Sequence, residues 1–303
     1  MKQLVILSGK GGTGKTSVAA ALAHLASQEL SIVLVDADVD AANLELVLEP
    51  TRLEEHVFMG GQVAVIDPNR CRPCGRCFNV CRFNAILPAE QTYRVDPLAC
   101  EGCASCVHQC PEGAIRTQEQ QAGFWFRSDT RFGPLFHAEL WAGQENSGKL
   151  VTMVKQQGRL LAQDTGSELL IVDGPPGIGC PVISASAGAD LALLVAEPTV
   201  SGIHDLERIL ATVDHFRVPA LVLVNKADLN RVHTARIEAF CQEYRIELVG
   251  KLPYDTVFTE AMVQGQPVTA YQPEGAVAKA LREAWARIQE RLGVENRRTV
   301  NGA

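Results

Sequence analysis

The residues with the clearest chemical signature are cysteines. The chain has 10 of them in 303 residues, and eight form two runs with the same spacing, C-x2-C-x2-C-x3-C. The first run is Cys71, Cys74, Cys77 and Cys81, and the second is Cys100, Cys103, Cys106 and Cys110. The runs are offset by a constant 29 residues (100 minus 71), and the similarity continues from Cys81–Ile86 to Cys110–Ile115, which identifies an internal repeat.

This spacing is typical of iron–sulfur ligation. Three thiolates on one tight loop bind one [4Fe–4S] cluster, and the fourth cysteine of the run binds the other cluster. We therefore expect a crossed arrangement. One cluster would be held by Cys71, Cys74, Cys77 and Cys110, and the second by Cys81, Cys100, Cys103 and Cys106.

Zinc and disulfides are the alternative uses of so many cysteines. Zinc ribbons use two separate C-x2-C pairs rather than four cysteines per run, and a dense cluster in a cytosolic chain favours metal over disulfides. The two remaining cysteines, Cys180 and Cys241, are expected to pack as small apolar residues.

The cysteine region resembles a bacterial two-cluster ferredoxin over about residues 62–117. One departure from that pattern is Arg82, which stands where a proline follows the fourth cysteine, and we expect it to change the turn and the potential of the nearby cluster. Arginines flank the first run and glutamates the second, which suggests an acidic redox partner for the first cluster's face.

A second chemical motif lies at the N-terminus. The apolar run 2–8 predicts a buried strand, and an Ala-rich helical pattern follows the P-loop sequence G-x4-G-K-T. We expect the P-loop backbone to bind the phosphates of ATP, Lys15 to reach the β- and γ-phosphates, and Thr16 to bind Mg²⁺. The predicted ATP-binding residues here are Gly9, Lys10, Gly11, Gly12, Thr13, Gly14, Lys15, Thr16 and Ser17.

Lys10, directly after the first glycine, is the feature of the deviant Walker A signature found in the MinD, Mrp, ParA and nitrogenase iron protein group. The chain resembles this MinD superfamily from end to end, apart from about residues 51–131. The resemblance implies that Lys10 crosses a dimer interface to the partner's nucleotide. It also implies that Asp38, in the DxD switch, orients water, so the predicted catalytic residues are Lys10, Lys15 and Asp38.

Further polar residues follow predicted strands at the same sheet edge. Asp36 and Asp173 end apolar strands and, with Thr16 and Asp38, form the predicted Mg²⁺ site. Asn225, Lys226 and Pro253 resemble the base-reading segments of the family, which implies contacts to adenine.

These motifs require a mostly parallel, doubly wound α/β sheet of the P-loop NTPase type. Strands are expected at 2–8, 31–35, 168–172, 191–196, 220–224 and 246–250. We expect an ATPase domain of residues 1–50 and 132–303, interrupted by an α+β ferredoxin domain of residues 51–131 with its cysteine core at 71–110.

The resulting functional hypothesis is an ATPase, slow and stimulated by a partner, that couples its switch to electron transfer through the two clusters. Two alternatives remain: an iron–sulfur or metallocofactor assembly carrier, and a spatial-organising ATPase with redox-sensing clusters. We expect a homodimer, or a heterodimer with a paralogue, formed through the nucleotide face, and a redox or cofactor-assembly partner.

Charge and hydropathy narrow the location and the partners. The formal charge of −7 argues against nucleic-acid binding, which usually shows as a basic domain. No apolar run is long enough for a membrane span, no secretory signal is visible, and we expect a cytoplasmic protein. The amphipathic stretch at about 275–292 is expected to pack in the core rather than on lipid.

Overall fold

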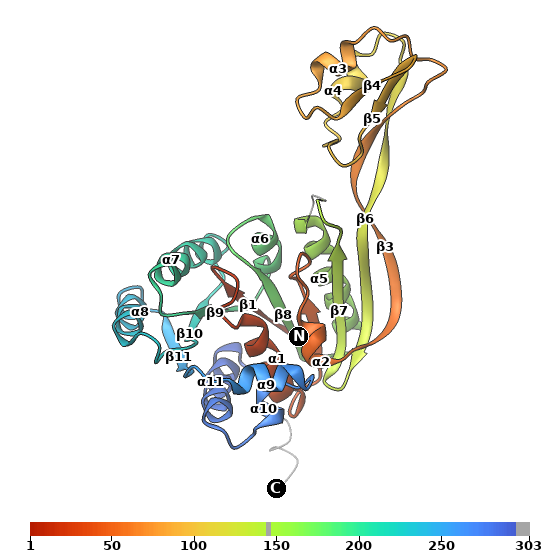
Figure 1. Cartoon of the computed structure of the whole chain (residues 1–303). Coiled ribbons are helices and arrows are strands. Elements are labelled where there is room, and N and C mark those ends of the chain that lie inside the picture. Colours follow the sequence, from red (N-terminus) through yellow and green to blue (C-terminus); the bar gives the residue numbers. More distant parts are fainter. Residues whose placement is uncertain (144–146, 295–303) are drawn as a thin grey trace. The chain divides into compact units, whose positions relative to one another are not determined.

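The computed structural model describes residues 1–143 and 147–294 (Figure 1). The chain forms two compact units. Among the described residues, the first comprises Met1–His56, Trp125–Glu139 and 147–294, and the second comprises Val57–Phe124 and 140–143. The predicted boundary of the inserted domain, residues 51–131, stays a prediction. The compact unit that contains all eight clustered cysteines has a shorter main segment, Val57–Phe124.

The first unit is built on a mainly parallel sheet. The full sheet has the order β11-β10-β9-β1-β8-β2-β7-β6-β3. Its parallel strands are β1 (Lys2–Ser8), β2 (Ile32–Asp36), β7 (Gly133–Leu140), β8 (Leu169–Pro176), β9 (Leu191–Ala196), β10 (Ala220–Val224) and β11 (Glu247–Lys251). The central strands are almost wholly buried, as expected for parallel strands covered on both faces.

The six predicted strands match β1, β2, β8, β9, β10 and β11, and the predicted mostly parallel α/β fold is confirmed. Two longer strands complete the sheet: β3 (Thr51–Ile66) at its edge and β6 (Ile115–Thr130), which joins β7 through a two-residue turn.

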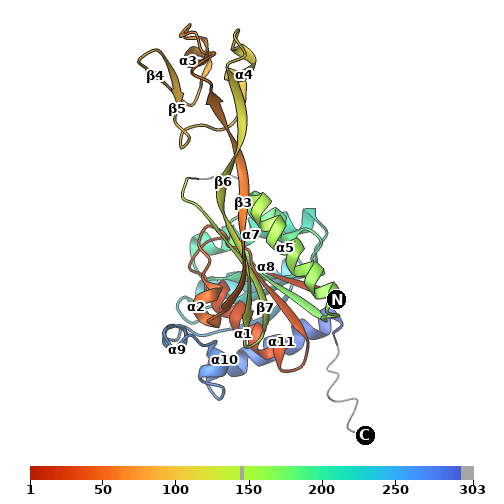
Figure 2. The same cartoon turned by 90° about the vertical axis from the view of Figure 1, so that its right-hand side faces the viewer.

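Two groups of helices cover the faces of this sheet (Figure 2). In one group, α1 packs against α2, α10 and α11; in the other, α5, α6, α7 and α8 pack in succession. These helices are α1 (Lys15–Ser27), α2 (Leu44–Leu48), α5 (Ser147–Asp164), α6 (Cys180–Ser186), α7 (Val200–His215), α8 (Arg231–Glu243), α9 (Val257–Val263), α10 (Val268–Tyr271) and α11 (Ala276–Leu292).

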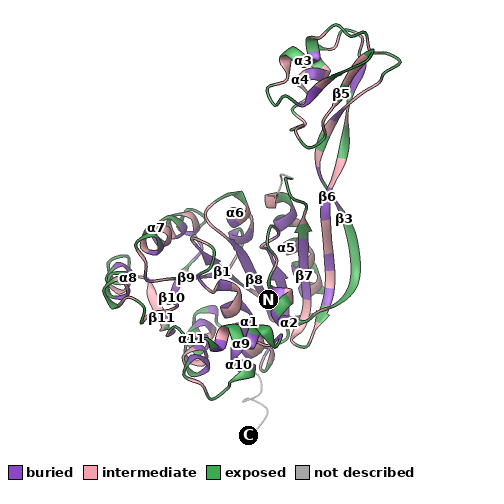
Figure 3. Cartoon of the chain, in the orientation of Figure 1, coloured by how far each residue is buried: buried purple, intermediate pink, exposed green. Residues whose placement is uncertain are grey.

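Burial follows the helical period on α11 (Figure 3). The stripe of Val277, Leu281, Trp285, Ile288 and Leu292 is at most 4% exposed and belongs to the main core. The prediction that this amphipathic helix packs in the core is therefore confirmed. No helix among residues 1–143 and 147–294 is long and apolar enough to cross a membrane.

The second unit repeats its own geometry. It contains α3 (Arg76–Val80), the antiparallel pair β4 (Ile86–Ala89) and β5 (Thr92–Val95), and α4 (Ser105–Gln109). Both short helices begin after a residue with positive φ, Gly75 and Ala104, which are 29 positions apart. The internal repeat in the sequence therefore corresponds to a repeat of backbone conformation.

The two turns after the fourth cysteines are also alike, although proline follows only one of them. Cys81 has φ −74° and ψ 109°, and Cys110 has φ −79° and ψ 111°. We expected Arg82 to change this turn, but the cysteine before Arg82 has the same backbone conformation as the cysteine before Pro111.

Candidate functional site

The P-loop leaves its backbone open toward the start of α1. Gly12 and Gly14 have φ of 79° and 88°, values that favour glycine. Gly14 is the N-cap of α1 and provides no side-chain cap, so the helix N-terminus keeps amide donors for phosphate. A Cβ atom on Gly14 would lie 2.3 Å from Nδ2 of Asn225, so this position also needs glycine for space.

The other P-loop residues lie between β1 and the first turn of α1. Gly9 packs closely enough against Asp205 that a Cβ atom there would lie 2.4 Å from Asp205 Cβ, whereas Gly11 has open space around its Cα. Thr16 and Ser17 belong to the first turn of α1.

Lys15 occupies a buried site among carboxylates. Its Nζ atom lies 2.6 Å from Oδ1 of Asp173 and 3.4 Å from Oγ1 of Thr16. Burial lowers the pKa of Lys15, but the charge and hydrogen bond of Asp173 outweigh burial and the net shift is upward. The lysine is thus held charged, next to the position where phosphate charge would be placed.

Asp36, one of the predicted Mg²⁺ ligands, has both carboxylate oxygens hydrogen-bonded to backbone N–H groups. It is fully buried, and its two carboxylate oxygens accept the backbone N–H groups of Asp38 and Leu44, each at 3.0 Å. Burial, followed by the charge of Asp173, raises its pKa to about 7. Asp36 therefore holds the loop that carries Asp38.

Asp38 lies partly exposed on that loop. Burial raises its pKa to about 6, and the nearby positive charge of Lys15 opposes this shift. A carboxylate with this pKa can accept a proton from water near neutral pH.

Two buried oxygen atoms in this site have no hydrogen-bond partner among the described residues: Oδ2 of Asp173 and Oγ1 of Thr13. Buried polar atoms are rarely left unpaired in proteins. A carboxylate and hydroxyl oxygens are the hard donors that Mg²⁺ prefers. The unpaired Oδ2 of Asp173 therefore fits Mg²⁺ bound with a nucleotide, and the membership of Thr16 and Asp38 in the donor set stays a prediction.

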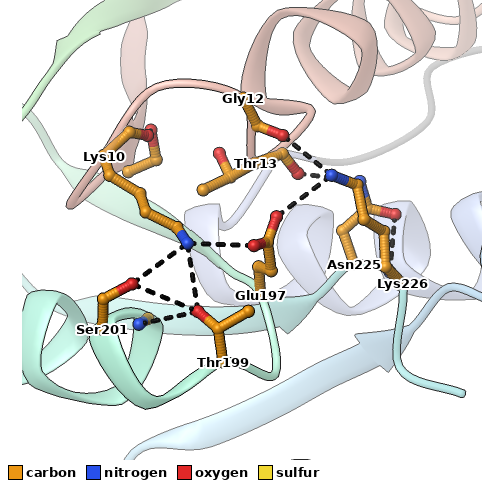
Figure 4. Close-up of polar contacts among 10 residues, drawn as sticks. Lys10, Gly12, Thr13, Glu197, Thr199, Ser201, Asn225 and Lys226 are labelled. Carbon is orange, nitrogen blue, oxygen red and sulfur yellow. Dashed lines mark hydrogen bonds and ion pairs between the residues drawn. The ribbon is translucent and has the colours of Figure 1, made fainter. Parts of the chain in front are cut away.

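Lys10 contacts its own chain, at the other side of the P-loop (Figure 4). Its Nζ atom lies 2.9 Å from Oε1 of Glu197, 3.0 Å from Oγ1 of Thr199 and 3.2 Å from Oγ of Ser201. Oε2 of Glu197 in turn lies 3.0 Å from Nζ of Lys226. Burial raises the pKa of Glu197, but the hydrogen bonds of the two lysines outweigh it and lower the pKa.

Sequence reasoning gave Glu197 no role. The available signal was its position directly after the apolar strand β9, next to the central strand β1 at the edge where the P-loop lies. A carboxylate at that edge is well placed to pair with P-loop lysines.

The predicted base-reading residues lie beside the P-loop. Nδ2 of Asn225 donates to the backbone oxygen of Thr13 at 2.8 Å, and Nζ of Lys226 donates to that of Gly12 at 2.9 Å. Pro253 borders a hollow of about 410 Å³ that is also lined by Asp228 and by residues of α8. Asn225 and Lys226 thus lie at the P-loop, whereas the hollow at Pro253 is lined by neither of them. Contact of the three residues with adenine stays a prediction.

The cysteines of the second unit also come together. One hollow is lined by Cys81, Cys100, Cys103 and Cys106, which is the set predicted for the second cluster. Backbone N–H groups donate to three sulfur atoms: Ala85 to Cys81 at 3.4 Å, Ala64 to Cys100 at 3.5 Å and Ala114 to Cys110 at 3.3 Å.

The first set is graded in exposure: Cys77 is buried, Cys71 and Cys110 are half-buried, and Cys74 is exposed. None of the ten cysteines, all of which lie within the described residues, forms a disulfide. Within the described ranges, no group of three or more His, Cys, Asp or Glu side chains is arranged around a single metal ion. A [4Fe–4S] cluster distributes its four thiolates over several irons, so its ligands need not converge on one point.

The two cysteines outside the repeat behave differently. Cys241 is 2% exposed, as predicted. Cys180 is exposed, so the prediction that it packs in the core is wrong. It begins α6, whose buried face is formed by Val182, Ala185 and Ser186.

Comparison with known proteins identifies the nucleotide-binding fold. The chain matches the CobQ/CobB/MinD/ParA nucleotide binding domain over residues 4–268. It belongs to this family. The matched domain is a nucleotide-binding domain, so the chain is a nucleotide-binding protein of the MinD/ParA type.

Individual relatives agree over nearly the whole chain. An uncharacterised protein of Methanocaldococcus jannaschii is 33% identical over 95% of this chain and 96% of its own length. The septum site-determining protein MinD of Pyrococcus horikoshii, solved with Mg-ADP, superimposes with a TM-score of 0.61 at 18% identity, covering 97% of this chain and 98% of that one. MinD of Aquifex aeolicus, solved in a complex with MinC, gives a TM-score of 0.58 at 19% identity and covers 96% of each chain.

Proposed function

We propose that this MinD/ParA-type ATPase carries two [4Fe–4S] clusters and couples its ATP-driven switch to electron transfer through them. The observation that carries the proposal is the hollow lined by one cysteine of the first run and three of the second. This grouping is the crossed arrangement that two-cluster ferredoxins use, and spacing along the chain would not by itself bring Cys81 to the second run.

In the nucleotide half, each residue has a proposed task. The P-loop amides and Lys15 bind the phosphates of ATP, and Lys15 exchanges its contact with Asp173 for the γ-phosphate. Thr16 and Asp173 hold Mg²⁺, which would neutralise phosphate charge. Asp38 orients the attacking water. We expect hydrolysis to be slow and to be stimulated by a partner.

Dimerisation through the nucleotide face follows from the family assignment. Lys10 would leave Glu197 and reach the nucleotide of a second subunit, either a copy of this chain or a paralogue. Its side chain is 30% exposed and its ammonium group is held by side chains of Glu197, Thr199 and Ser201.

In the cysteine half, the donor chemistry fits clusters. Four thiols line one hollow, and backbone N–H groups point at sulfur in both sets. Such N–H donors stabilise the negative charge on cluster sulfur and help to set its potential. Bound clusters would supply one-electron chemistry.

The connection between the halves begins at α2. Oε2 of Glu45 lies 3.5 Å from Nδ1 of His137 in β7. The other ring nitrogen, Nε2 of His137, forms a hydrogen bond of 2.9 Å with Oγ of Ser128 in β6. Arg131, in the β6–β7 turn, donates to the backbone oxygen of Val47 at 3.3 Å. These contacts attach the end of the switch segment to a strand that begins at Ile115, five residues after Cys110.

A second candidate is a spatial-organising ATPase in which the clusters sense redox state. The similarity to MinD over nearly the full length of both chains favours it. The two candidates differ in which event controls the other. In the first, ATP controls electron transfer through the clusters, whereas in the second, oxidation of the clusters controls dimerisation or surface binding.

The proposal is tested on anaerobically purified full-length protein. Iron and sulfide analysis should give about eight of each per chain, as expected for two cubanes. EPR of the reduced protein should change on addition of MgATP, and the Thr16→Ala variant should keep its iron but lose that change. Iron well below this level would overturn the cluster assignment, and an EPR signal indifferent to MgATP would overturn coupling.

A further inference from the structure

One segment of the second unit combines an exposed predicted cluster ligand with exposed basic and aromatic side chains. Five of the seven residues of Arg72–Phe78 are exposed, and they include Arg72, Cys74, Arg76 and Phe78. The Arg72 side chain is 80% exposed, and Phe78 is 46% exposed, with its ring 6.0 Å from that of Tyr93. We call these four residues the Cys74 face.

The corresponding residues of the second repeat have the opposite character. At an offset of 29 positions they are Glu101, Cys103, Ser105 and Val107. Cys103 is as open as Cys74, but an acidic residue replaces Arg72, a hydroxyl replaces Arg76, and the half-buried Val107 replaces the exposed ring. The repeat therefore presents two exposed predicted ligands whose aligned neighbours differ in charge, although the positive charge of Arg82 also lies near Cys103.

Little of the positive charge on the Cys74 face is neutralised within the chain. Arg72 makes one contact, Nε to Oε2 of Glu112 at 3.7 Å, between exposed groups. Arg76 forms no ion pair with any residue that the structure describes. Arg70, beside this face, donates to the backbone oxygen of Glu112 at 3.1 Å and so keeps its full charge.

We infer that the Cys74 face is the docking surface for an acidic one-electron carrier protein. The inference rests on the proposed function and specifies the partner. In the transfer, the reduced cluster bound by Cys71, Cys74, Cys77 and Cys110 loses one electron, the carrier gains it, and no proton moves. Complementary charge would steer the carrier to Cys74, and Phe78 would supply the apolar contact that such interfaces place near their centre.

The repeat itself supplies the variants that test this inference. Arg72→Glu with Arg76→Ser gives the first run the residues that the second run already has, so the fold should tolerate them. The matched control is Glu101→Arg with Ser105→Arg, which makes the converse exchange around Cys103.

The probes are a flavodoxin of net negative charge and a basic cytochrome c, mixed with the dithionite-reduced, desalted full-length protein in a stopped-flow instrument. At low salt the wild type should reduce flavodoxin with a rate constant that falls about tenfold or more as salt is raised, because steering between charged surfaces is screened. In the Arg72→Glu/Arg76→Ser variant this low-salt rate should fall by about tenfold, and the rate with cytochrome c should rise. The control should keep the wild-type flavodoxin rate at high salt and at least that rate at low salt.

A binding measurement accompanies the kinetics. The dissociation constant for flavodoxin, measured by titration calorimetry on oxidised protein, should weaken in the first variant and not in the control. Equal salt dependence in wild type and first variant, or unchanged binding, would overturn the docking surface even when iron content is full. Missing iron in the wild type would instead overturn the proposed function, so the two failures are distinguishable.

Discussion

Replacing Glu197 by glutamine tests whether the intrachain contact with Glu197 restrains Lys10 from reaching the nucleotide of a second subunit. Glu197 is 14% exposed and bridges Lys10 at 2.9 Å and Lys226 at 3.0 Å. Each is a charge-assisted contact to a lysine that is less than one-third exposed. With screening by solvent, each contributes about 0.5–1 kcal/mol. The Glu197→Gln variant should therefore lose about 1–2 kcal/mol of unfolding free energy without nucleotide.

The same substitution should strengthen dimerisation. Lys10 must break its contact with Glu197 before it can reach a second subunit's nucleotide. Because each subunit of a homodimer contributes one Lys10, removing about 0.5–1 kcal/mol per subunit, about 1–2 kcal/mol per dimer, should tighten ATP-dependent dimerisation roughly five- to thirtyfold. Sedimentation equilibrium with MgATP and a non-hydrolysing Asp38→Asn background measures the dimer constant, and urea unfolding measures stability.

The lowered pKa of Glu197 adds a pH signature. An acid whose pKa is lower in the folded state contributes stability above its unfolded pKa and loses it as pH falls through the folded value. The stability gap between wild type and Glu197→Gln should therefore be full at pH 7 and close below about pH 4.

The matched control is Glu238→Gln, which removes a 2.7 Å ion pair with Lys251 between more exposed groups. It should change stability by less than about 0.5 kcal/mol and leave dimerisation unaltered. A Glu197→Gln protein that dimerises no more tightly than this control would refute the reasoning, because Lys10 would then not be restrained by its own chain.

Three further substitutions test other parts of the site. Burial raises the pKa of Asp36 to about 7, so the folded protein binds this proton more tightly than the unfolded chain does. The unfolding free energy without nucleotide should therefore fall as pH rises from about 4 to about 7. In urea titrations, the Asp36→Asn variant should show a smaller fall over this range. Gly14→Ala, at φ 88° and 2.3 Å from Nδ2 of Asn225, should cost at least about 1–2 kcal/mol and weaken ATP binding in calorimetry; unchanged values would contradict the close approach. Cys81→Ser should reduce iron from about eight to about four per chain and spare the cluster held by Cys110, whereas loss of the other cluster would reject crossed ligation.

The strands and the P-loop could be predicted from the sequence because their signals are local. Buried parallel strands have continuous apolar sequences. The first residue of each of the six predicted strands is within one residue of the observed first residue. The glycine, lysine and threonine spacing of the P-loop likewise needs only one strand–loop–helix segment. The repeat of 29 residues was equally local, and it extends to the backbone angles of Cys81 and Cys110.

The contacts that sequence reasoning missed join distant segments. Glu197 is 187 positions from Lys10, and only the strand order, with β9 beside β1, makes them neighbours. Asp36 was expected near Mg²⁺ from its place at the end of β2, but its two backbone partners depend on how the following loop folds back. Cys180 was misjudged because its helix has only seven residues, too few for a clear period in sequence.

The position of α2 bears on how the two halves could be coupled. Asp36 accepts the N–H groups of Asp38 and of Leu44, the first residue of α2, so one buried carboxylate fixes both the switch loop and the helix that follows. From the end of α2 at Leu48, only two residues precede β3. So short a link leaves little slack to absorb a shift of the helix. If MgATP changes the protonation or the contacts of Asp36, α2 must respond, and its contacts with His137 and Arg131 transmit that response to β6 and β7. Asp36, the buried carboxylate of the predicted Mg²⁺ site, lies fifteen residues before Thr51, where the cysteine-bearing segment begins. This short separation is the physical basis for expecting that the two halves work together.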